Sequence, residues 1–536
     1  MTRHAPGPRV APLVVLAVLL PLVGPAGGAA ADGRRRDFTP GAVDVGDPYE
    51  PGLGNGGYDA LHYDVAVDYR PATGRLSGHT TVTARATQDL SRFDLDFALT
   101  ASEVSVDGVA AEFRSRRISG DNGIELEVTP ATGIPDGATF TVDVTYAGTP
   151  ASVTRNGYSP WSDTPTGITC WNDPDPAAQW WLPLDEHPSD KATFDVAVTA
   201  PADRQAISNG VRLGRTVTGS RATTRWRSAQ PLSPHLVFLT IGRYRLERGR
   251  AVGVPAYYFF EKGSGLLGRA RPDVLRTPRV LSFLQRQLGP YPFDAAGGIV
   301  FGWAFPTAFE TQTKPTYAEG VWLRRRDNVW VVVHENAHQW FGDDVTFGRW
   351  RYVWLSEGFA TYAEWLWSQE TGEGSAQRMF LATYRLYSAN PDFWAERVDR
   401  PYYPLSITVY DRGAMTLQAL RNVVGTRDFF RIIRTWARER SGGNGTTARF
   451  RALAERVSGR SLDRFFHVWL ERPRRPAPTA PVARRRGPRR TTVPLRPARR
   501  PPMGCHRTAG RGPRSPRRRG GRGRRWCRAA ASRPTR

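Results

Sequence analysis

Apolar and polar side chains alternate along much of the first half of the chain. Apolar residues occupy every second position from Leu61 to Val67 and again from Phe140 to Tyr146, with mainly polar residues between them. This period of two is typical of strands that bury one face. Glycine, proline and aspartate turn signals are frequent here and helical periodicity is scarce, so we expect an antiparallel β domain over residues 32–245.

The pattern changes near residue 260. Apolar residues recur at helical spacing over 272–288, which predicts a helix. Glycine and proline directly after residue 288 end this helix, and a short apolar strand is predicted at 297–303. Further amphipathic helices follow, to about residue 470. We therefore predict a multidomain α+β protein whose second domain, residues 246–471, is mainly α-helical.

The first 31 residues follow a different pattern. Arg3 and Arg9 precede an apolar run that contains prolines and ends in the three alanines that finish at Ala31. This order is typical of a secretory signal peptide, which predicts cleavage after Ala31 and a secreted protein. The run is shorter than the ~20 residues that a spanning helix needs, so we expect no membrane anchor.

The charge of the chain is concentrated at its end. A net charge of +25 would suggest nucleic acid or another polyanion as partner. Residues 472–536, however, hold 23 arginines and no Asp or Glu. When these 23 arginines, Arg3 and Arg9 are left out of the count, 50 of the 75 basic residues remain, which equals the number of acidic residues, 50. We therefore expect no nucleic-acid binding by the folded body.

The arginine-rich tail, residues 472–536, has almost no aliphatic side chains and is predicted to be disordered. Three interpretations are open. It is a segment that binds polyanions or a cell surface, an inert solvated extension, or an out-of-frame translation of GC-rich DNA, whose codons give this mixture of arginine, proline, glycine and alanine. The abrupt loss of acidic residues favours the third.

An apolar run at residues 331–340, VVVHENAHQW, is interrupted by candidate metal ligands. His334 and His338 are four residues apart, so on a helix both imidazoles can reach one point while Glu335 projects beside it. Catalytic zinc sites use three protein ligands and leave the fourth position for water. Glu357, with 18 residues between it and His338, opens the next predicted helix and supplies the third ligand.

Glu335 is then placed to act as a general base. A zinc ion lowers the pKa of its water toward ~7, and a neighbouring carboxylate can take the proton as hydroxide attacks a carbonyl. The alternative is an ordinary core helix with two buried histidines. A glutamate buried between them without a charged partner makes that alternative costly.

These motifs resemble those of the M1 zinc aminopeptidases. HENAHQWFGD followed by WLSEGFATY carries the resemblance, which extends over about 58–470 through LPLDEHPSDKATF and GPYPFDAAGGIV. It implies an N-terminal β saddle before a thermolysin-like helical peptidase domain. It also implies a zinc ion held by His334, His338 and Glu357, with Glu335 as base.

The same resemblance gives Glu310 a role. Glu310, in AFETQT, stands where the family has a glycine-x-methionine-glutamate-asparagine motif, whose glutamate receives the free α-ammonium of the substrate. Ala308, Phe309 and Thr311 depart from that motif, which leaves the alignment of the peptide less defined than the charge pairing. The alternative for Glu310 is a surface turn residue.

Two further site residues follow from the resemblance. Tyr410, in VYDRGAM, is similar to the tyrosine of the family's tyrosine-x-lysine-glycine-alanine, whose hydroxyl would donate to the oxyanion; Arg412 replaces the lysine. The alternative for Tyr410 is packing at a helix start. The family's β domain also supplies a second amine-binding acid. Asp173 is the candidate, and Asp175 competes because the segment is one residue longer than expected.

The chain is therefore predicted to be a secreted zinc aminopeptidase that hydrolyses N-terminal residues from peptides, with one zinc ion per chain. One alternative keeps the zinc chemistry without the terminal constraint and gives an endopeptidase of the same fold. The other is a catalytically silent protein that binds peptides or polyanions, with the tail as its active part.

Overall fold

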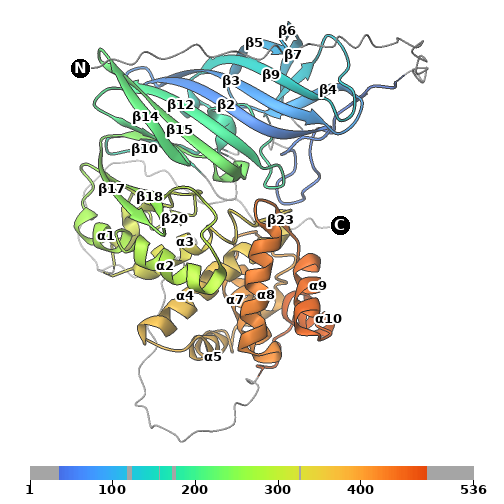
Figure 1. Ribbon diagram of the computed structural model, residues 1–536, viewed down its shortest axis with the longest axis vertical. Helices are drawn as coiled ribbons and strands as arrows, with labels where there is room; N and C mark the ends of the chain where they lie inside the picture. Colours follow the sequence, from blue (N-terminus) through green and yellow to red (C-terminus); the bar gives the residue numbers. More distant parts are fainter. Residues whose placement is uncertain are drawn as a thin grey trace, which may run out of the picture.

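The computed structural model describes residues 36–117, 124–155, 157, 159–171, 177–324 and 327–479. The predicted signal peptide lies outside these residues, as do the tail beyond 479 and both Asp173 and Asp175. A β-rich part, built from the N-terminal half, lies against a mainly helical part built from the C-terminal half (Figure 1). The predicted fold class is confirmed by this arrangement.

The largest sheet of the β-rich part has eight strands in the order β14-β15-β12-β2-β3-β9-β5-β6. Their bounds are β2 (Tyr58–Arg70), β3 (Arg75–Ala86), β5 (Thr100–Val106), β6 (Val109–Ala110), β9 (Thr139–Gly148), β12 (Ala192–Pro201), β14 (Val211–Thr218) and β15 (Arg221–Leu232). Tyr63, Val65 and Val67 are buried as the alternation predicts, whereas Leu61 is half-exposed because a bulge between Ala60 and His62 shifts the register.

Two four-stranded sheets complete the β-rich part. One has the order β1-β4-β8-β7, and the other β10-β11-β16-β13. Their bounds are β1 (Thr39–Pro40), β4 (Leu90–Asp96), β7 (Glu112–Arg117), β8 (Ile124–Thr129), β10 (Trp161–Thr164), β11 (Gly167–Cys170), β13 (Gln205–Ile207) and β16 (Leu239–Gly242). Most neighbours are antiparallel, as expected, but β2 and β12 run parallel, as do β1 and β4.

A five-stranded sheet of order β17-β18-β19-β21-β20 introduces the helical part. Its strands are β17 (Tyr244–Ala251), β18 (Val254–Glu261), β19 (Ala296–Phe301), β20 (Ala308–Phe309) and β21 (Thr316–Ala318). The helix expected over 272–288 is two helices, α1 (Leu267–Val274) and α2 (Thr277–Leu288). Thr277 bonds the carbonyl of Val274 through its hydroxyl, and Pro278 occupies the first turn of α2, so a new helix begins there.

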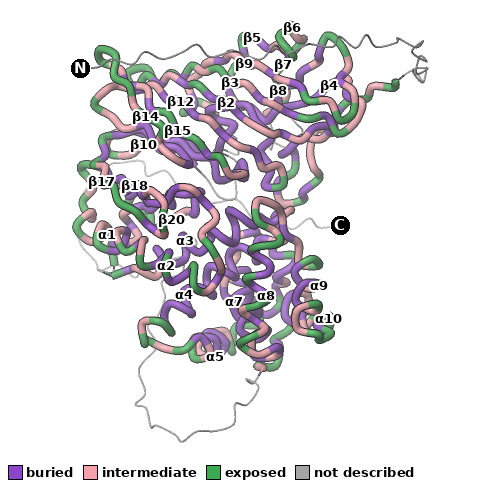
Figure 2. Tube along the Cα trace, viewed as in Figure 1, coloured by how far each residue is buried: buried purple, intermediate pink, exposed green. Residues whose placement is uncertain are grey.

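The remaining helices enclose an apolar core. They are α3 (Val329–Ala337), α4 (Trp354–Thr371), α5 (Ala376–Leu386), α6 (Pro391–Ala395), α7 (Ile407–Val424), α8 (Thr426–Arg440), α9 (Thr447–Ser458) and α10 (Asp463–Phe466), with a small sheet of β22 (Thr346–Phe347) and β23 (Asn444–Gly445). Figure 2 shows α4 and α7 buried along most of their length, while α5 and α9 alternate buried and exposed residues. The central helices α3, α4 and α7 therefore carry the core.

Among the described residues, no helix has both the length and the apolar character that crossing a bilayer requires.

Candidate metal and peptide site

Helix α3 ends in the predicted ligand pair. His334 lies in its last turn, and His338 directly follows Ala337 with helical backbone angles of φ −56° and ψ −28°. The two imidazole ring centres are therefore only 4.8 Å apart. Glu357 comes from the first turn of α4, and its Oε2 lies 3.2 Å from His334 Nε2 and 3.5 Å from His338 Nε2. Three potential ligand atoms thus converge on one buried point.

Each histidine is oriented by a bond on its other ring nitrogen. His334 Nδ1 lies 2.8 Å from Glu364 Oε1, and His338 Nδ1 lies 2.8 Å from Ser356 Oγ. These partners favour the tautomers that leave both Nε2 atoms available for a metal. Glu364 was not predicted from the sequence. The sequence does contain a feature that could have indicated it. Glu364 follows Glu357 by seven residues, so two turns of α4 place both carboxylates on one face of the helix.

The ligand set fits a zinc ion. His334, His338 and Glu357 are all buried, and their ligand atoms lie within 4.8 Å of one another. Two neutral imidazoles and one carboxylate form a donor set that zinc uses in catalytic sites. Neighbouring side chains hold both imidazoles, so the arrangement does not depend on a metal ion to orient them.

Tyr410 reaches the same region from helix α7. Its ring lies nearly parallel to that of His334, with ring centres 6.0 Å apart. The approach of α7 to α4 is made possible by two glycines: a Cβ on Gly413 would lie 2.9 Å from the Cα of Gly358. Because Gly358 follows Glu357 and Gly413 lies three residues after Tyr410, this contact constrains the separation of these two candidate site residues.

Glu310 and Glu335 add two more buried carboxylates. Glu310 follows strand β20. One carboxylate oxygen of Glu310, one of Glu335 and one ring nitrogen of His338 all lie within 4.8 Å of one another. Burial raises the pKa of Glu335 to about 8, against the lowering effect of His334 and His338. Burial also raises the pKa of Glu310. Burial therefore disfavours the ionised forms of both carboxyl groups.

Gln339 connects the Glu310 loop to the histidine helix. Its Nε2 donates to the carbonyl of Glu310 at 2.9 Å, and its Oε1 accepts from the backbone N–H of Thr313 at 2.7 Å. Thr313 has a φ of +72°, which is strained for a β-branched residue. This role of Gln339 was not predicted, because a glutamine after a ligand has no characteristic spacing.

The β-rich part also contacts the loops of the site. Lys191 Nζ donates to the carbonyls of Asp343 and Asp344, at 2.7 and 2.9 Å, in the turn after the histidines. The backbone N–H of Gly210 donates to Thr313 Oγ1 at 2.9 Å, in the loop after Glu310. Both loops are thus held from outside the helical part.

Asp173 and Asp175 lie outside the described residues, so their predicted role stays a prediction. Trp171, the last described residue before them, packs its ring against Phe309 with centres 3.8 Å apart. This contact brings the end of β11 beside the residue that precedes Glu310.

Two family models match the two parts of the chain. The family model described as the peptidase M1 N-terminal domain matches residues 59–236, and that of the peptidase family M1 domain matches residues 314–469. Aminopeptidase M1 of Arabidopsis thaliana is 24% identical over 324 residues, which cover 56% of this chain and 36% of that protein. Aminopeptidase M1-B of Oryza sativa subsp. japonica is 24% identical over 54% of this chain and 35% of its own length. The chain thus spans about a third of the length of these curated relatives.

Solved structures match over more of their length. An M1 zinc metallopeptidase from Deinococcus radiodurans is 29% identical, with a TM-score of 0.73, and the match covers 82% of this chain and 100% of that one. A mutant of a two-domain M1 zinc metallopeptidase bound to L-arginine is 30% identical with the same TM-score and coverage. A mutant of the Deinococcus radiodurans enzyme has been solved with a Tyr-Ser-Ala substrate.

Proposed function

The chain belongs to peptidase family M1, and from this premise we propose that it is a secreted zinc aminopeptidase that removes single residues from the N-termini of peptides. The leader pattern of residues 1–31 supports secretion. The related structures that hold a Tyr-Ser-Ala substrate or L-arginine support peptides with a free terminus as the substrate class.

The observation that carries the proposal is the position of Glu310. Its buried carboxylate shares one small region with Glu335 and His338, beside the three proposed zinc ligands. A buried carboxylate is stable only when a cation or hydrogen-bond donors compensate it. The α-ammonium of a peptide supplies such a cation and places the first peptide bond next to the ligands. A site that needs this ammonium cleaves one residue from the end.

The roles of the other residues follow from their positions. His334, His338 and Glu357 hold one zinc ion, which when bound supplies Lewis acidity and lowers the pKa of water. Glu335 accepts the proton that the attacking water loses and can then pass it to the leaving amine.

Tyr410 stabilises the charge that develops on the carbonyl oxygen. A phenolic O–H pointed at that oxygen forms its strongest bond when the oxygen is negative, which lowers the barrier of the chemical step by about 3 kcal/mol. Its position, stacked beside His334, is set by the contact of Gly413 with Gly358.

The test compares peptides with free and N-acetylated termini. We expect the wild-type enzyme to cleave the free peptide and to leave the acetylated one nearly intact, because the blocked terminus leaves Glu310 buried without a cation. Glu310→Gln should lower kcat/KM for the free peptide by about 100-fold or more, since it removes a charge-assisted contact, while the zinc content stays the same.

Glu370→Gln is the matched control. Glu370 lies on the exposed end of α4 and pairs with Arg286 at 2.8 Å, so its substitution should leave kcat/KM unchanged. Equal cleavage of free and acetylated peptides would identify the endopeptidase alternative. Absence of turnover with a full complement of zinc would favour the silent binding protein.

A further inference from the structure

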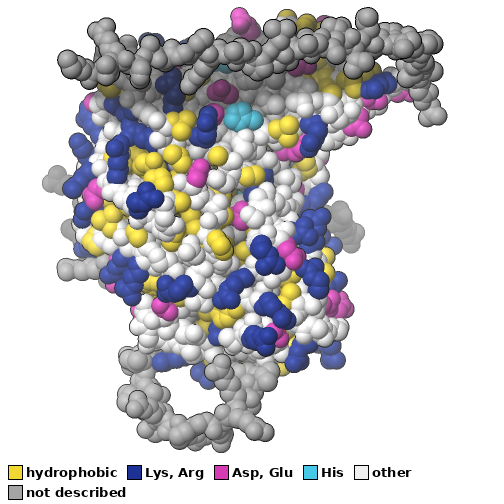
Figure 3. Space-filling model, in the orientation of Figure 1, with side chains coloured by type: hydrophobic (Ala, Val, Ile, Leu, Met, Phe, Trp, Pro, Cys, Tyr) yellow, Lys and Arg dark blue, Asp and Glu magenta, His cyan; other side chains and the backbone are white. Residues whose placement is uncertain are grey.

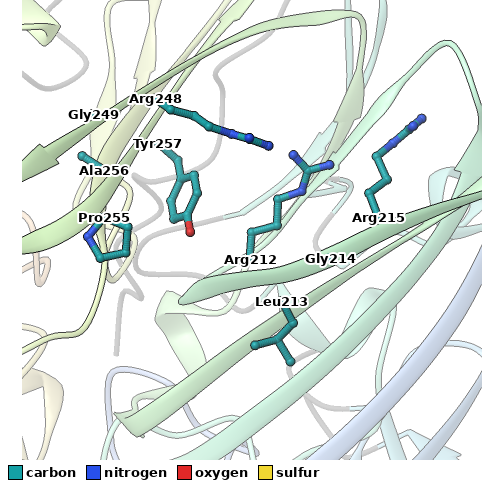
Figure 4. A pocket seen from close by; sticks show the side chains of 9 residues that line it. All are labelled: Arg212, Leu213, Gly214, Arg215, Arg248, Gly249, Pro255, Ala256 and Tyr257. Atoms are coloured by element: carbon teal, nitrogen blue, oxygen red, sulfur yellow. The ribbon is translucent and has the colours of Figure 1, made fainter.

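A cavity lies away from the proposed zinc ligands, between the two parts of the molecule. Its volume is about 580 Å³, and it separates β14, the edge strand of the eight-stranded sheet, from β17, the edge strand of the five-stranded sheet. Its lining comes from 212–215 on β14, from Arg248 and Gly249 on β17, and from 255–257 on β18 (Figure 4). None of these residues belongs to the site described above.

A bulge in β14 brings two of its arginines to this cavity. Arg212 and Arg215 are three positions apart, which in a regular strand would place them on opposite faces. The register shifts between Arg212 and Gly214, so that Arg212 pairs with Trp226 and Arg215 with Thr224. Trp226 and Thr224 are two residues apart on β15, and therefore both arginines lie on the same face.

Arg248 adds a third guanidinium from the other wall. It lies opposite Tyr257 in the β17–β18 pair, so both side chains share the face that borders the cavity. Figure 4 shows the guanidinium groups of Arg212 and Arg248 turned toward each other, while the Tyr257 hydroxyl points away from both of them. Figure 3 shows Lys and Arg side chains prominent along the side of the molecule where β14 and β17 lie.

Within the described part of the chain, no salt bridge neutralises these positive charges. No Asp or Glu is among the described residues that line the cavity. The Nε atoms of Arg212 and Arg215 are buried without a hydrogen-bond partner in the described part of the chain. Glu247, beside Arg248 in β17, is bound instead by Arg245 and Arg271.

The arrangement is costly without an anion. Burial, with the charges of Arg248 and Arg215, lowers the pKa of Arg212. Arg215 cannot relieve the repulsion by turning away freely, because one of its terminal N–H groups donates to the carbonyl of Ala202 at 2.6 Å. Arg248 is exposed to solvent, so the electrostatic cost falls mainly on the half-buried Arg212, and a ligand of opposite charge in the cavity would relieve it.

The chemistry of the lining indicates which anion fits. Planar guanidinium groups match the oxygens of a phosphate. A volume of about 580 Å³ is in the range of small-molecule sites and exceeds the needs of a bare ion. Pro255 provides apolar surface for the remainder of a ligand. We propose that this cavity binds a dianionic phosphate group, carried by inorganic phosphate or by a small phosphomonoester.

The test measures binding of two probes to the full-length zinc-loaded protein by calorimetry at low salt. Inorganic phosphate and phenyl phosphate should each bind saturably at one site. Tighter binding of phenyl phosphate would identify a phosphomonoester as the natural ligand, and equal affinity would identify the free ion. Arg212→Gln and Arg248→Gln should each weaken both probes about tenfold or more, because each removes a charge-assisted contact.

Two further variants make the result decisive. Gly214→Asp places a carboxylate in the cavity at a position with open space around a Cβ, so it should abolish binding while leaving the fold intact. Arg225→Gln, on the exposed face of β15, is the matched charge control and should bind as the wild type does. Peptide turnover should be unchanged in all four variants. The proposal is overturned when the wild type binds neither probe, or when Gly214→Asp and Arg212→Gln leave the affinities unchanged.

Discussion

Glu335 and His334 are neighbours in the chain, but their proposed tasks are separable. Glu335→Gln keeps the shape of the side chain and removes its ability to accept a proton, so the variant should retain zinc and lose nearly all turnover. His334→Ala removes a ligand and should lose zinc as well. Metal analysis of both purified proteins, alongside turnover of an aminoacyl-coumarin substrate, checks this. A zinc-replete and fully active Glu335→Gln enzyme would contradict the role of the base.

At the scale of single residues, the sequence predicted those with a fixed spacing. The i, i+4 pair of His334 and His338 requires only that the segment be helical, and Glu357 requires only that the next helix fold back. Gln339 was missed because its role depends on the loop that returns to it, where it bonds both Glu310 and Thr313. Such a contact joins segments that are far apart in the sequence, and no local sequence pattern predicts that they lie close together in space.

Gly413 tests how closely α4 and α7 must approach. A Cβ at this position would lie 2.9 Å from the Cα of Gly358, so Gly413→Ala should push the helices apart and destabilise the protein by about 1–3 kcal/mol. Because α7 carries Tyr410, kcat should fall more than KM rises. The measurements are thermal unfolding and steady-state kinetics.

Gly268→Ala is the control for that variant. Gly268 lies in α1, and a Cβ added there would meet nothing within 4 Å, so alanine should stabilise the helix slightly and leave kcat unchanged. Gly413→Ala enzyme with wild-type kinetics would show that the helix separation does not control the position of Tyr410.

Strands β4 and β8 hold two acids directly opposite each other. Asp96 pairs with Glu125 in the ladder, and both are fully buried. The Asp96 carboxylate accepts from the backbone N–H groups of Gly54 and Glu186. Burial, with the charge of Asp96, raises the pKa of Glu125 well above its ordinary value. The folded protein therefore keeps a proton on Glu125 that the unfolded chain releases above about pH 4.5.

This proton makes stability depend on pH. Because the folded state binds the extra proton, the contribution of Glu125 to the free energy of unfolding falls as pH rises above about 4.5. Glu125→Gln is neutral at every pH and should remove that decline. Its melting temperature should match the wild type near pH 4 and exceed it increasingly toward pH 8. A constant difference across that range would show that Glu125 does not carry the proton.

The elements themselves were predictable where one period dominates. The strand from Phe140 to Tyr146 is buried at every second position, as its alternation requires. The break between α1 and α2 was not predicted, because the apolar spacing continues through it while Thr277 and Pro278 begin a new helix. The parallel pairing of β2 with β12 joins strands more than a hundred residues apart, which no local pattern specifies.

Arg412 ties the end of the described chain to the catalytic half. It is fully buried, and its guanidinium donates to the carbonyls of Trp394, Glu396 and Arg472. Tyr384 and Asn422 bond the carbonyls of Pro476 and Thr479, at 2.6 and 2.9 Å. The tail from residue 472 was predicted to be disordered throughout. Its first eight residues, 472–479, instead pack against α5 and α7.

This packing predicts different results for two truncations. A chain that ends at Thr479 keeps these contacts and should keep the melting temperature and peptide turnover of the full-length protein. A chain that ends at Glu471 leaves part of the buried Arg412 guanidinium without partners and should lose about 3 kcal/mol of stability. Both should lose salt-dependent binding to heparin. Calorimetric unfolding and a heparin column provide the readouts, and equal stability of the two truncations would contradict the role of residues 472–479.

Lys191 and Gly210 join the β-rich part to the two loops that flank the candidate site. Their partners are backbone carbonyls after the histidines and the Thr313 hydroxyl after Glu310, so the attachment depends on the shape of the first loop and on the side chain at position 313 in the second. Domains joined in this way are not interchangeable modules. A β domain transplanted from a distant homologue would have to reproduce the positions of both anchors to hold the two loops in place.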